Sequence, residues 1–124
     1  MFDNKKPTAM MLGRWQPWHK GHTELFKKAI TKTGQVCIMI RDVQGFEDNP
    51  FSTTDVADKI IKELNKENFT YNIDYVIIKV PNIVNISYGR GVGYTFTEHD
   101  LGEDIHQISA TKIRKQMRED GDLA

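Results

Sequence analysis

The sequence predicts an α/β domain built around a mostly parallel sheet, and three observations support this class. Apolar runs typical of buried strands alternate with amphipathic helical patterns as far as residue 80. That alternation favours parallel strands joined by right-handed helical crossovers. The 124 residues suffice for one hydrophobic core but are too few for two domains. We therefore treat residues 1–124 as a single domain.

The first strand and the first helix are predicted before residue 35. Residues 8–13 form an apolar run that stops at Gly13, which is typical of a buried strand followed by a turn. The next segment has apolar side chains at helical spacing and can end at Gly34. These apolar positions are Leu25, Phe26, Ala29 and Ile30.

A second strand, a second helix and a third strand follow in the same order. Residues 36–40 are apolar throughout, as in a strand that is covered on both faces. Residues 41–50 are polar and predict a loop, and residues 52–55 fit a capping box at a helix start. The apolar stripe of that helix consists of Val56, Ile60, Ile61 and Leu64. Residues 75–80, ended by Pro81, predict the third strand.

The patterns after Pro81 are shorter. Residues 84–88 and 94–98 predict two short strands around a glycine-rich turn, and a further helix is predicted from Ser109. Between the third strand and that helix there is too little length for a full strand-helix-strand unit. We therefore expect a Rossmann-like three-layer sandwich with a mostly parallel sheet that is shortened in its C-terminal half.

Composition and charge exclude several classes of partner. The 17 basic side chains balance the 17 acidic ones, so we expect no nucleic-acid binding. The longest apolar run, residues 36–40, is far shorter than the roughly 20 residues that span a bilayer, so no membrane association is expected. No secretory signal opens the chain, which predicts a cytoplasmic location. Cys37 is the only cysteine and excludes internal disulfides and cysteine-based zinc sites.

We expect the functional site at the carboxyl end of the first strand. In open parallel sheets, ligands bind beyond the strand ends, where helix N-termini offer unpaired amides and a partial positive charge. His19 and His22 lie three residues apart at a helix start and can face one ligand, while Gly21 permits a close approach. Two imidazoles in this place suit phosphate oxygens, although the same spacing also occurs in surface turns and metal sites.

Two motifs resemble those of a known superfamily. Residues 13–22 read Gly-Arg-Trp-Gln-Pro-Trp-His-Lys-Gly-His. This segment is similar to the Gly-Arg-Phe-Gln-Pro-Phe-His-x-Gly-His signature of the nucleotidyltransferases that are named for their His-x-Gly-His motif. Residues 108–114 read Ile-Ser-Ala-Thr-Lys-Ile-Arg, similar to the second motif of that superfamily, Ile-Ser-x-Thr-x-x-Arg. Both motifs stand in the right order and on the right predicted elements.

The resemblance implies a nucleotidyltransferase reaction without a covalent enzyme intermediate. An acceptor oxygen attacks the α-phosphorus of a nucleoside triphosphate, and catalysis rests on alignment and charge stabilisation. The resemblance implies catalytic roles for His19, His22 and Arg114, and a Mg²⁺ ion held mainly by phosphates and water. The positions that it implies for nucleotide binding are Gly13, Arg14, Trp15, Gln16, Gly21, Ile108, Ser109, Ala110 and Thr111.

Details of the motifs favour ATP over CTP, and AMP as the transferred group. The first motif resembles that of archaeal-type nicotinamide-mononucleotide adenylyltransferases, and residues 49–52, Asn-Pro-Phe-Ser, resemble a segment of the same enzymes. Those enzymes usually have Glu-Arg where this chain has Asp55 and Val56. The candidates for binding a small phosphorylated or anionic acceptor are Arg41, Asn49 and Arg90.

Several alternatives stay open. The domain can be a CTP-dependent cytidylyltransferase, or a catalytically idle nucleotide-binding or regulatory module. Trp15 and Trp18 fit base stacking and core filling equally well. The shortened C-terminal half predicts that part of the acceptor pocket is missing or is supplied by another subunit, and a homodimer is one candidate assembly. A metal-dependent hydrolase would use His19, His22, His99 and His106.

Overall fold

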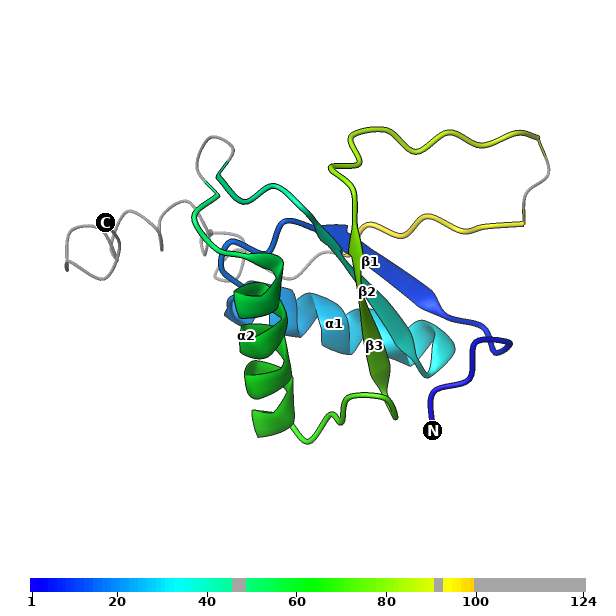
Figure 1. Cartoon of the computed structure of the whole chain (residues 1–124). Helices are drawn as coiled ribbons and strands as arrows, with labels where there is room; N and C mark the ends of the chain where they lie inside the picture. The colour runs from blue at the N-terminus through cyan, green and yellow to red at the C-terminus, as the bar shows by residue number, and fades with distance from the viewer. Residues whose placement is uncertain (46–48, 91–92, 100–124) are drawn as a thin grey trace.

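The computed structural model describes residues 1–45, 49–90 and 93–99 (Figure 1). Three strands alternate with two helices and form a parallel sheet in the order β1-β2-β3. The elements are β1 (Ala9–Gly13), α1 (Lys20–Thr33), β2 (Val36–Arg41), α2 (Thr53–Lys66) and β3 (Tyr75–Val80). The predicted α/β class, the parallel sheet and the order of these five elements are confirmed.

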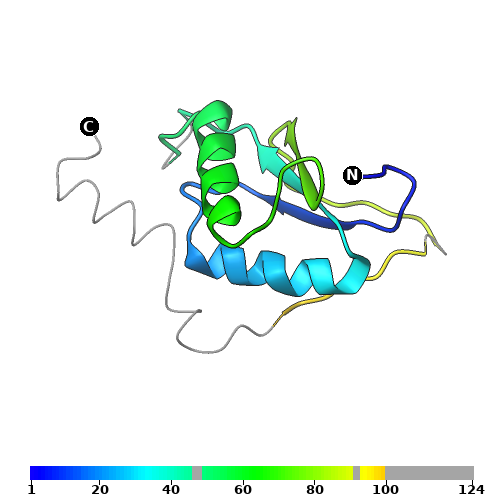
Figure 2. The same cartoon turned by 90° about the horizontal axis from the view of Figure 1, so that it is seen from below.

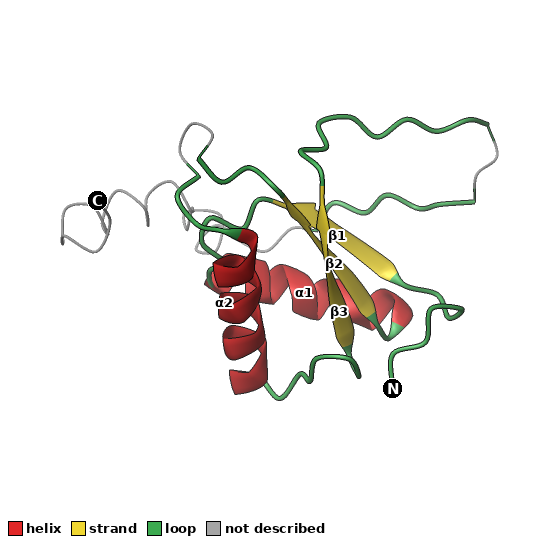
Figure 3. Cartoon of the chain, in the orientation of Figure 1, coloured by secondary structure: helices red, strands yellow, loops and turns green. Residues whose placement is uncertain are grey.

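Both helices cover the same face of the sheet (Figure 3). Along β2, Val36, Ile38 and Ile40 are buried, and they share one hydrophobic cluster with Phe26 of α1 and Ile60 of α2. Right-handed crossovers that advance in one direction across a parallel sheet place their helices on one side. Figure 2 shows α1 running beneath the strands. The described residues therefore supply two of the three expected layers.

Side-chain and glycine caps set the helix ends. Ser52 caps α2, its hydroxyl accepting a hydrogen bond from the Asp55 amide at 3.1 Å, which is one of the two hydrogen bonds of the predicted capping box. Gly34 ends α1 in the left-handed region at φ 86°, where a residue without Cβ is favoured. Neither α1 nor α2, the helices of the described part, has the length and apolar character to cross a bilayer.

A buried glutamine secures the amino end of the sheet. The Gln35 side chain is 5% exposed, and its Oε1 accepts a hydrogen bond from the Asp3 amide. Its Nε2 donates to the Asp3 carbonyl and to Thr8 Oγ1, both at 2.7 Å. These bonds fasten the N-terminal segment to the start of β1 and β2.

The prediction of two short strands after Pro81 is wrong. Residues 84–88 and 94–98 are irregular, although their apolar side chains alternate. A strand needs a neighbour for its backbone groups, and the only pairings that β3 makes in the described part are with β2 and at Tyr71. Tyr88 and Phe96 contact each other with ring centroids 5.6 Å apart, yet both stay mostly exposed. The helix predicted from Ser109 lies outside the described residues.

Candidate active site

The turn after β1 is shaped by the two tryptophans of the first motif. Trp15 has a left-handed backbone at φ 53°, and its indole Nε1 donates to the Met39 carbonyl at 3.0 Å. The ring lies over Gly13, where a Cβ would come within 2.8 Å of it. Trp18 donates from Nε1 to Thr23 Oγ1 at 2.8 Å. Only 7% of Trp15 and 1% of Trp18 is exposed, so both indoles are part of the hydrophobic core.

His19 and His22 meet at the N-terminus of α1. His19 is the N-cap residue, and its Nδ1 accepts a hydrogen bond from the Gly21 amide at 3.0 Å. His22 Nδ1 accepts from the His19 amide at 3.1 Å, which completes a reciprocal cap. The two rings stack with centroids 3.7 Å apart. Because each Nδ1 is an acceptor, the proton of each neutral ring is on Nε2.

Burial keeps both imidazoles neutral. Loss of solvent lowers the pKa of His19 below its usual value. Loss of solvent, together with the charge that His19 would carry, lowers the pKa of His22 to about 3. Trp15 and Trp18 enclose the His22 ring, at centroid distances of 4.8 and 5.4 Å. At neutral pH the pair can therefore donate two Nε2–H groups without a positive charge.

A segment far along the chain fits against this turn. Gln16 Nε2 donates to the Phe51 carbonyl, and the Phe51 amide donates to Gln16 Oε1, both at 2.8 Å. Arg14 precedes Gln16 by two residues, and Asn49 precedes Phe51 by two. Arg14 Nη1 lies 3.4 Å from Asn49 Oδ1. Gln16 and Asn49 are buried, whereas Arg14 is exposed. The motif turn and residues 49–51 thus form one unit.

The other predicted arginines lie in different surroundings. Arg41 ends β2, and its Nη2 donates to Asn82 Oδ1 at 2.8 Å just beyond β3. Its Nε is buried and has no partner within the described residues. Arg90 is exposed, and no described hydrogen bond or ion pair joins it to the histidines. Residues 108–114, the second motif, lie outside the described residues.

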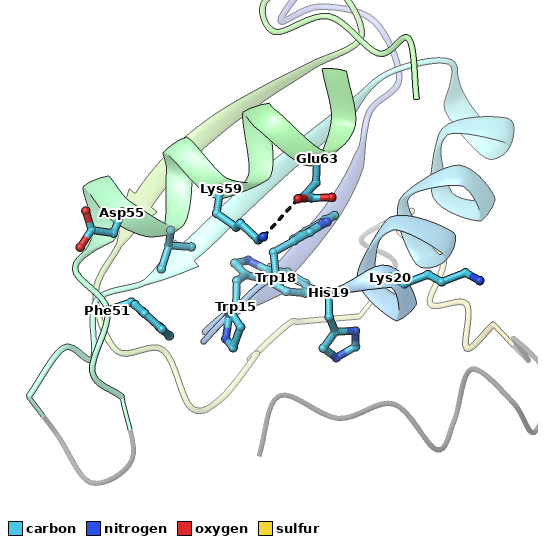
Figure 4. Close-up of a pocket in the computed structure, with 10 residues that line it drawn as sticks. Trp15, Trp18, His19, Lys20, Phe51, Asp55, Lys59 and Glu63 are labelled. Carbon is cyan, nitrogen blue, oxygen red and sulfur yellow. Dashed lines mark ion pairs between the residues drawn. The ribbon is translucent and has the colours of Figure 1, made fainter. Parts of the chain in front are cut away.

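A cavity of about 550 Å³ opens beside the motif turn, between the start of α1 and α2 (Figure 4). Its size is typical of a small-molecule site. Lys59 and Glu63 form an ion pair of 3.1 Å along its α2 side. The lining residues are Trp15, Pro17, Trp18, His19, Lys20, Phe51, Asp55, Val56, Lys59 and Glu63. The charged α2 residues in this lining, Asp55, Lys59 and Glu63, had no place in the site predicted from the sequence, because their spacing marks only the polar face of a helix.

Comparison with known proteins identifies the family, although no family model matches the chain. A nicotinamide-nucleotide adenylyltransferase of Methanococcus aeolicus is 35% identical over 113 residues, which cover 86% of this chain and 66% of that protein. One of Methanococcus maripaludis is 36% identical over 88% of this chain and 77% of its own length. A Thermoplasma acidophilum relative with the same name is 31% identical over 67% of this chain and 46% of its own length.

The chain belongs to the nicotinamide-nucleotide adenylyltransferase family. This membership confirms the resemblance inferred from the two motifs and the expected enzyme class, an adenylyltransferase. The chain spans about two thirds of the Methanococcus aeolicus adenylyltransferase and less than half of the Thermoplasma acidophilum one.

The donor set gives no support to a metal-dependent hydrolase. Within residues 1–45, 49–90 and 93–99, no three His, Cys, Asp or Glu side chains gather where they could hold a metal ion. His19 and His22 use both Nδ1 atoms to cap α1, and His99 does not join them. His106 lies outside the described residues.

Proposed function

We propose that the chain transfers AMP from ATP to a small phosphorylated acceptor and releases pyrophosphate. Nicotinamide mononucleotide is the first acceptor to test, because the relatives are named for a nicotinamide nucleotide. The observation that carries the proposal is the pair of neutral imidazoles at the N-terminus of α1, whose Nδ1 atoms are engaged while their Nε2–H groups are available to a ligand.

In the proposed reaction, a phosphate oxygen of the acceptor attacks the α-phosphorus of ATP. The bond from the α-phosphorus to the bridging oxygen breaks, and that oxygen leaves with pyrophosphate. His19 and His22 donate Nε2–H to non-bridging phosphate oxygens as negative charge shifts toward the leaving group. Backbone amides hold both rings in place, so the donors need no reorganisation during the step.

Positive charge comes from other groups, because the imidazoles are neutral. The exposed side chains of Arg14 and Lys20 flank the turn and can reach phosphate oxygens. We expect Mg²⁺ to arrive with the triphosphate, bound by phosphate oxygens and water, where it would neutralise phosphate charge. The described carboxylates form no cluster that fits it otherwise. Ser109, Thr111 and Arg114 of the second motif stay predictions for completing the triphosphate site.

For the acceptor we propose the carboxyl end of the sheet where β2 and β3 lie side by side. Arg41 and Asn82 meet there, and the buried Nε of Arg41 still has a hydrogen to donate. A guanidinium of this kind suits the phosphate of the acceptor. Arg90 stays a second candidate, and so do the homodimer and the cytoplasmic location predicted from the sequence.

The test is an assay of pyrophosphate release with ATP or CTP and a panel of phosphorylated acceptors. We expect release with ATP and nicotinamide mononucleotide, together with formation of the dinucleotide. Faster turnover with CTP would reassign the protein to cytidylyl transfer. Nucleotide binding without turnover of any acceptor would overturn the proposal in favour of an idle binding module.

A further inference from the structure

Gln16 occupies an unusual position within the motif turn. It is polar, yet only 3% of it is exposed. Its amide group engages both backbone groups of Phe51, donating to the carbonyl and accepting from the amide. These two hydrogen bonds resemble those between the backbones of two paired strands, with the glutamine side chain in place of one backbone. It joins segments that lie 35 residues apart in the chain.

The Gln16 contact lies beside a second one in the same register. Arg14 and Asn49 each precede the bonded pair by two residues, and Arg14 Nη1 faces Asn49 Oδ1 at 3.4 Å. Asn49 is buried, with 4% of it exposed, whereas Arg14 is exposed. The buried side-chain amide of Asn49 therefore contacts one side of the Arg14 guanidinium, which solvent otherwise surrounds. A long flexible cation loses entropy when it binds a ligand, and a fixed neighbour reduces that loss.

We infer that Gln16 is a positioning residue that acts through residues 49–51 on the Arg14 guanidinium. By fixing the Phe51 backbone, Gln16 sets Asn49, and Asn49 orients Arg14 toward the triphosphate. The inference rests on the proposed function, because it takes ATP as the ligand of Arg14. Gln16 itself touches no phosphate in this scheme.

The chain offers a matched control for a purely structural role. Gln35 is also a buried glutamine whose amide both accepts from and donates to backbone, but it lies at the amino end of the sheet. Gln16→Met and Gln35→Met remove comparable hydrogen bonds, so we expect both to lower the free energy of unfolding. Only Gln16→Met should alter the use of ATP.

A double-mutant cycle tests the coupling of Gln16 to Arg14. The first set of variants is Arg14→Ala, Gln16→Met and the double variant, and the control set has Gln35→Met in place of Gln16→Met. For each full-length variant we would measure kcat/KM for ATP, the Kd of ATP and unfolding in urea. In the wild-type background, Gln16→Met should lower kcat/KM by about tenfold, and in the Arg14→Ala background by less than about threefold. Gln35→Met should change kcat/KM by less than about twofold in either background.

Equal losses from Gln16→Met with and without Arg14 would overturn the inference, and so would a loss of the same size from Gln35→Met. Gln16→Asn, which is too short to reach Phe51 but stays polar, replaces Gln16→Met if that variant does not fold. A wild-type protein that binds ATP without turnover would refute the proposed function alone. In that case the same cycle in Kd decides whether Gln16 positions Arg14.

Discussion

A buried glutamine side chain joins two segments at each end of the parallel sheet, but the two ends have different roles. At the amino end, Gln35 ties the N-terminal segment to β1, and its partners are Asp3 and Thr8. At the carboxyl end, Gln16 ties the motif turn to Phe51 in the same manner. Beside Gln16, however, the hydrogen bonds that His19 and His22 make with other described residues use only their Nδ1 atoms.

The two ends therefore differ in whether their polar side chains still have a hydrogen-bond donor available for a ligand. Buried polar groups are normally satisfied within the protein, as they are around Gln35. Within the described residues, the Nε2 atoms of the histidine pair have no partner, although each ring is held through its other nitrogen. The amino end therefore serves stability, and under the proposed function the carboxyl end receives the phosphate groups of the nucleotide. Four predictions test this contrast.

The largest effect is expected from His19→Asn. Asparagine is a good N-cap, so its side chain can still accept from the Gly21 amide while the Nε2–H donor is lost. We expect kcat to fall by about 10²–10³-fold, as for the loss of one transition-state donor. Steady-state kinetics and urea unfolding would separate the two effects. His99→Asn, the same substitution away from the turn, is the control, and equal activity of both variants would refute the assigned role.

The next effect concerns the shape of the turn. In Gly13→Ala, the new Cβ would lie 2.8 Å from the Trp15 indole, so the ring or the strand end must move. We expect the free energy of unfolding to fall by about 1–3 kcal/mol, as in other overpacked sites. Gly89→Ala is the matched control, because a Cβ there meets nothing within 4 Å. Similar midpoints in urea for the two variants would show that Trp15 does not cover Gly13.

A third prediction uses pH. Both histidines have pKa values lowered by burial, that of His22 to about 3, so between their ordinary 6.5 and those values the unfolded chain binds more protons than the folded one. Their contribution to stability is complete above pH 6.5 and is lost as the pH falls toward the folded-state pKa. For His22 the loss is up to about 1.4 kcal/mol per pH unit over this range.

The measurement is the free energy of unfolding between pH 7 and pH 4.5. The free energy of unfolding of the His22→Asn variant is subtracted from that of the wild type at each pH. The difference reports on the His22 ring, because the carboxylates titrate in both proteins. We expect the wild type to lose more stability than the variant over this range. Parallel curves for the two proteins would mean that His22 is protonated as easily in the folded state as in the unfolded one.

The smallest effect is expected at the amino end, from Thr8→Val. This change keeps the shape of the side chain but removes the hydroxyl that accepts from Gln35 and donates to the Lys6 carbonyl. We expect a loss of about 1 kcal/mol in the free energy of unfolding and no change in kcat or KM. A change in catalysis would contradict the division between the two ends.

Most of the fold could be predicted because its signals are local. The periodicity of apolar residues identified all three strands and both helices, and Ser52 and Gly34 marked helix ends correctly. The same reasoning was wrong for residues 84–88 and 94–98. Alternation shows that a segment can be a strand, but a strand forms only where a neighbouring backbone accepts its hydrogen bonds.

The site was predictable in part for the same reason. The spacing of His19 and His22 is local, so the sequence placed both rings on one helix start. Lys59 and Glu63, in contrast, line the cavity from α2 and look in the sequence like ordinary solvated charges. The Gln16 amide looks like a ligand-binding group in the motif, whereas in the structure Phe51 engages it.

The sequence by itself determined the order of the elements and the position of His19 and His22 at one helix start, because these follow from short-range periodicity and motif spacing. Only the tertiary structure decided that Trp15 and Trp18 are core residues, that both histidines are partly buried and have lowered pKa values, and that residues 49–51 pack against the turn. Each of these depends on packing between segments far apart in the chain, which sets burial and the choice of hydrogen-bond partner.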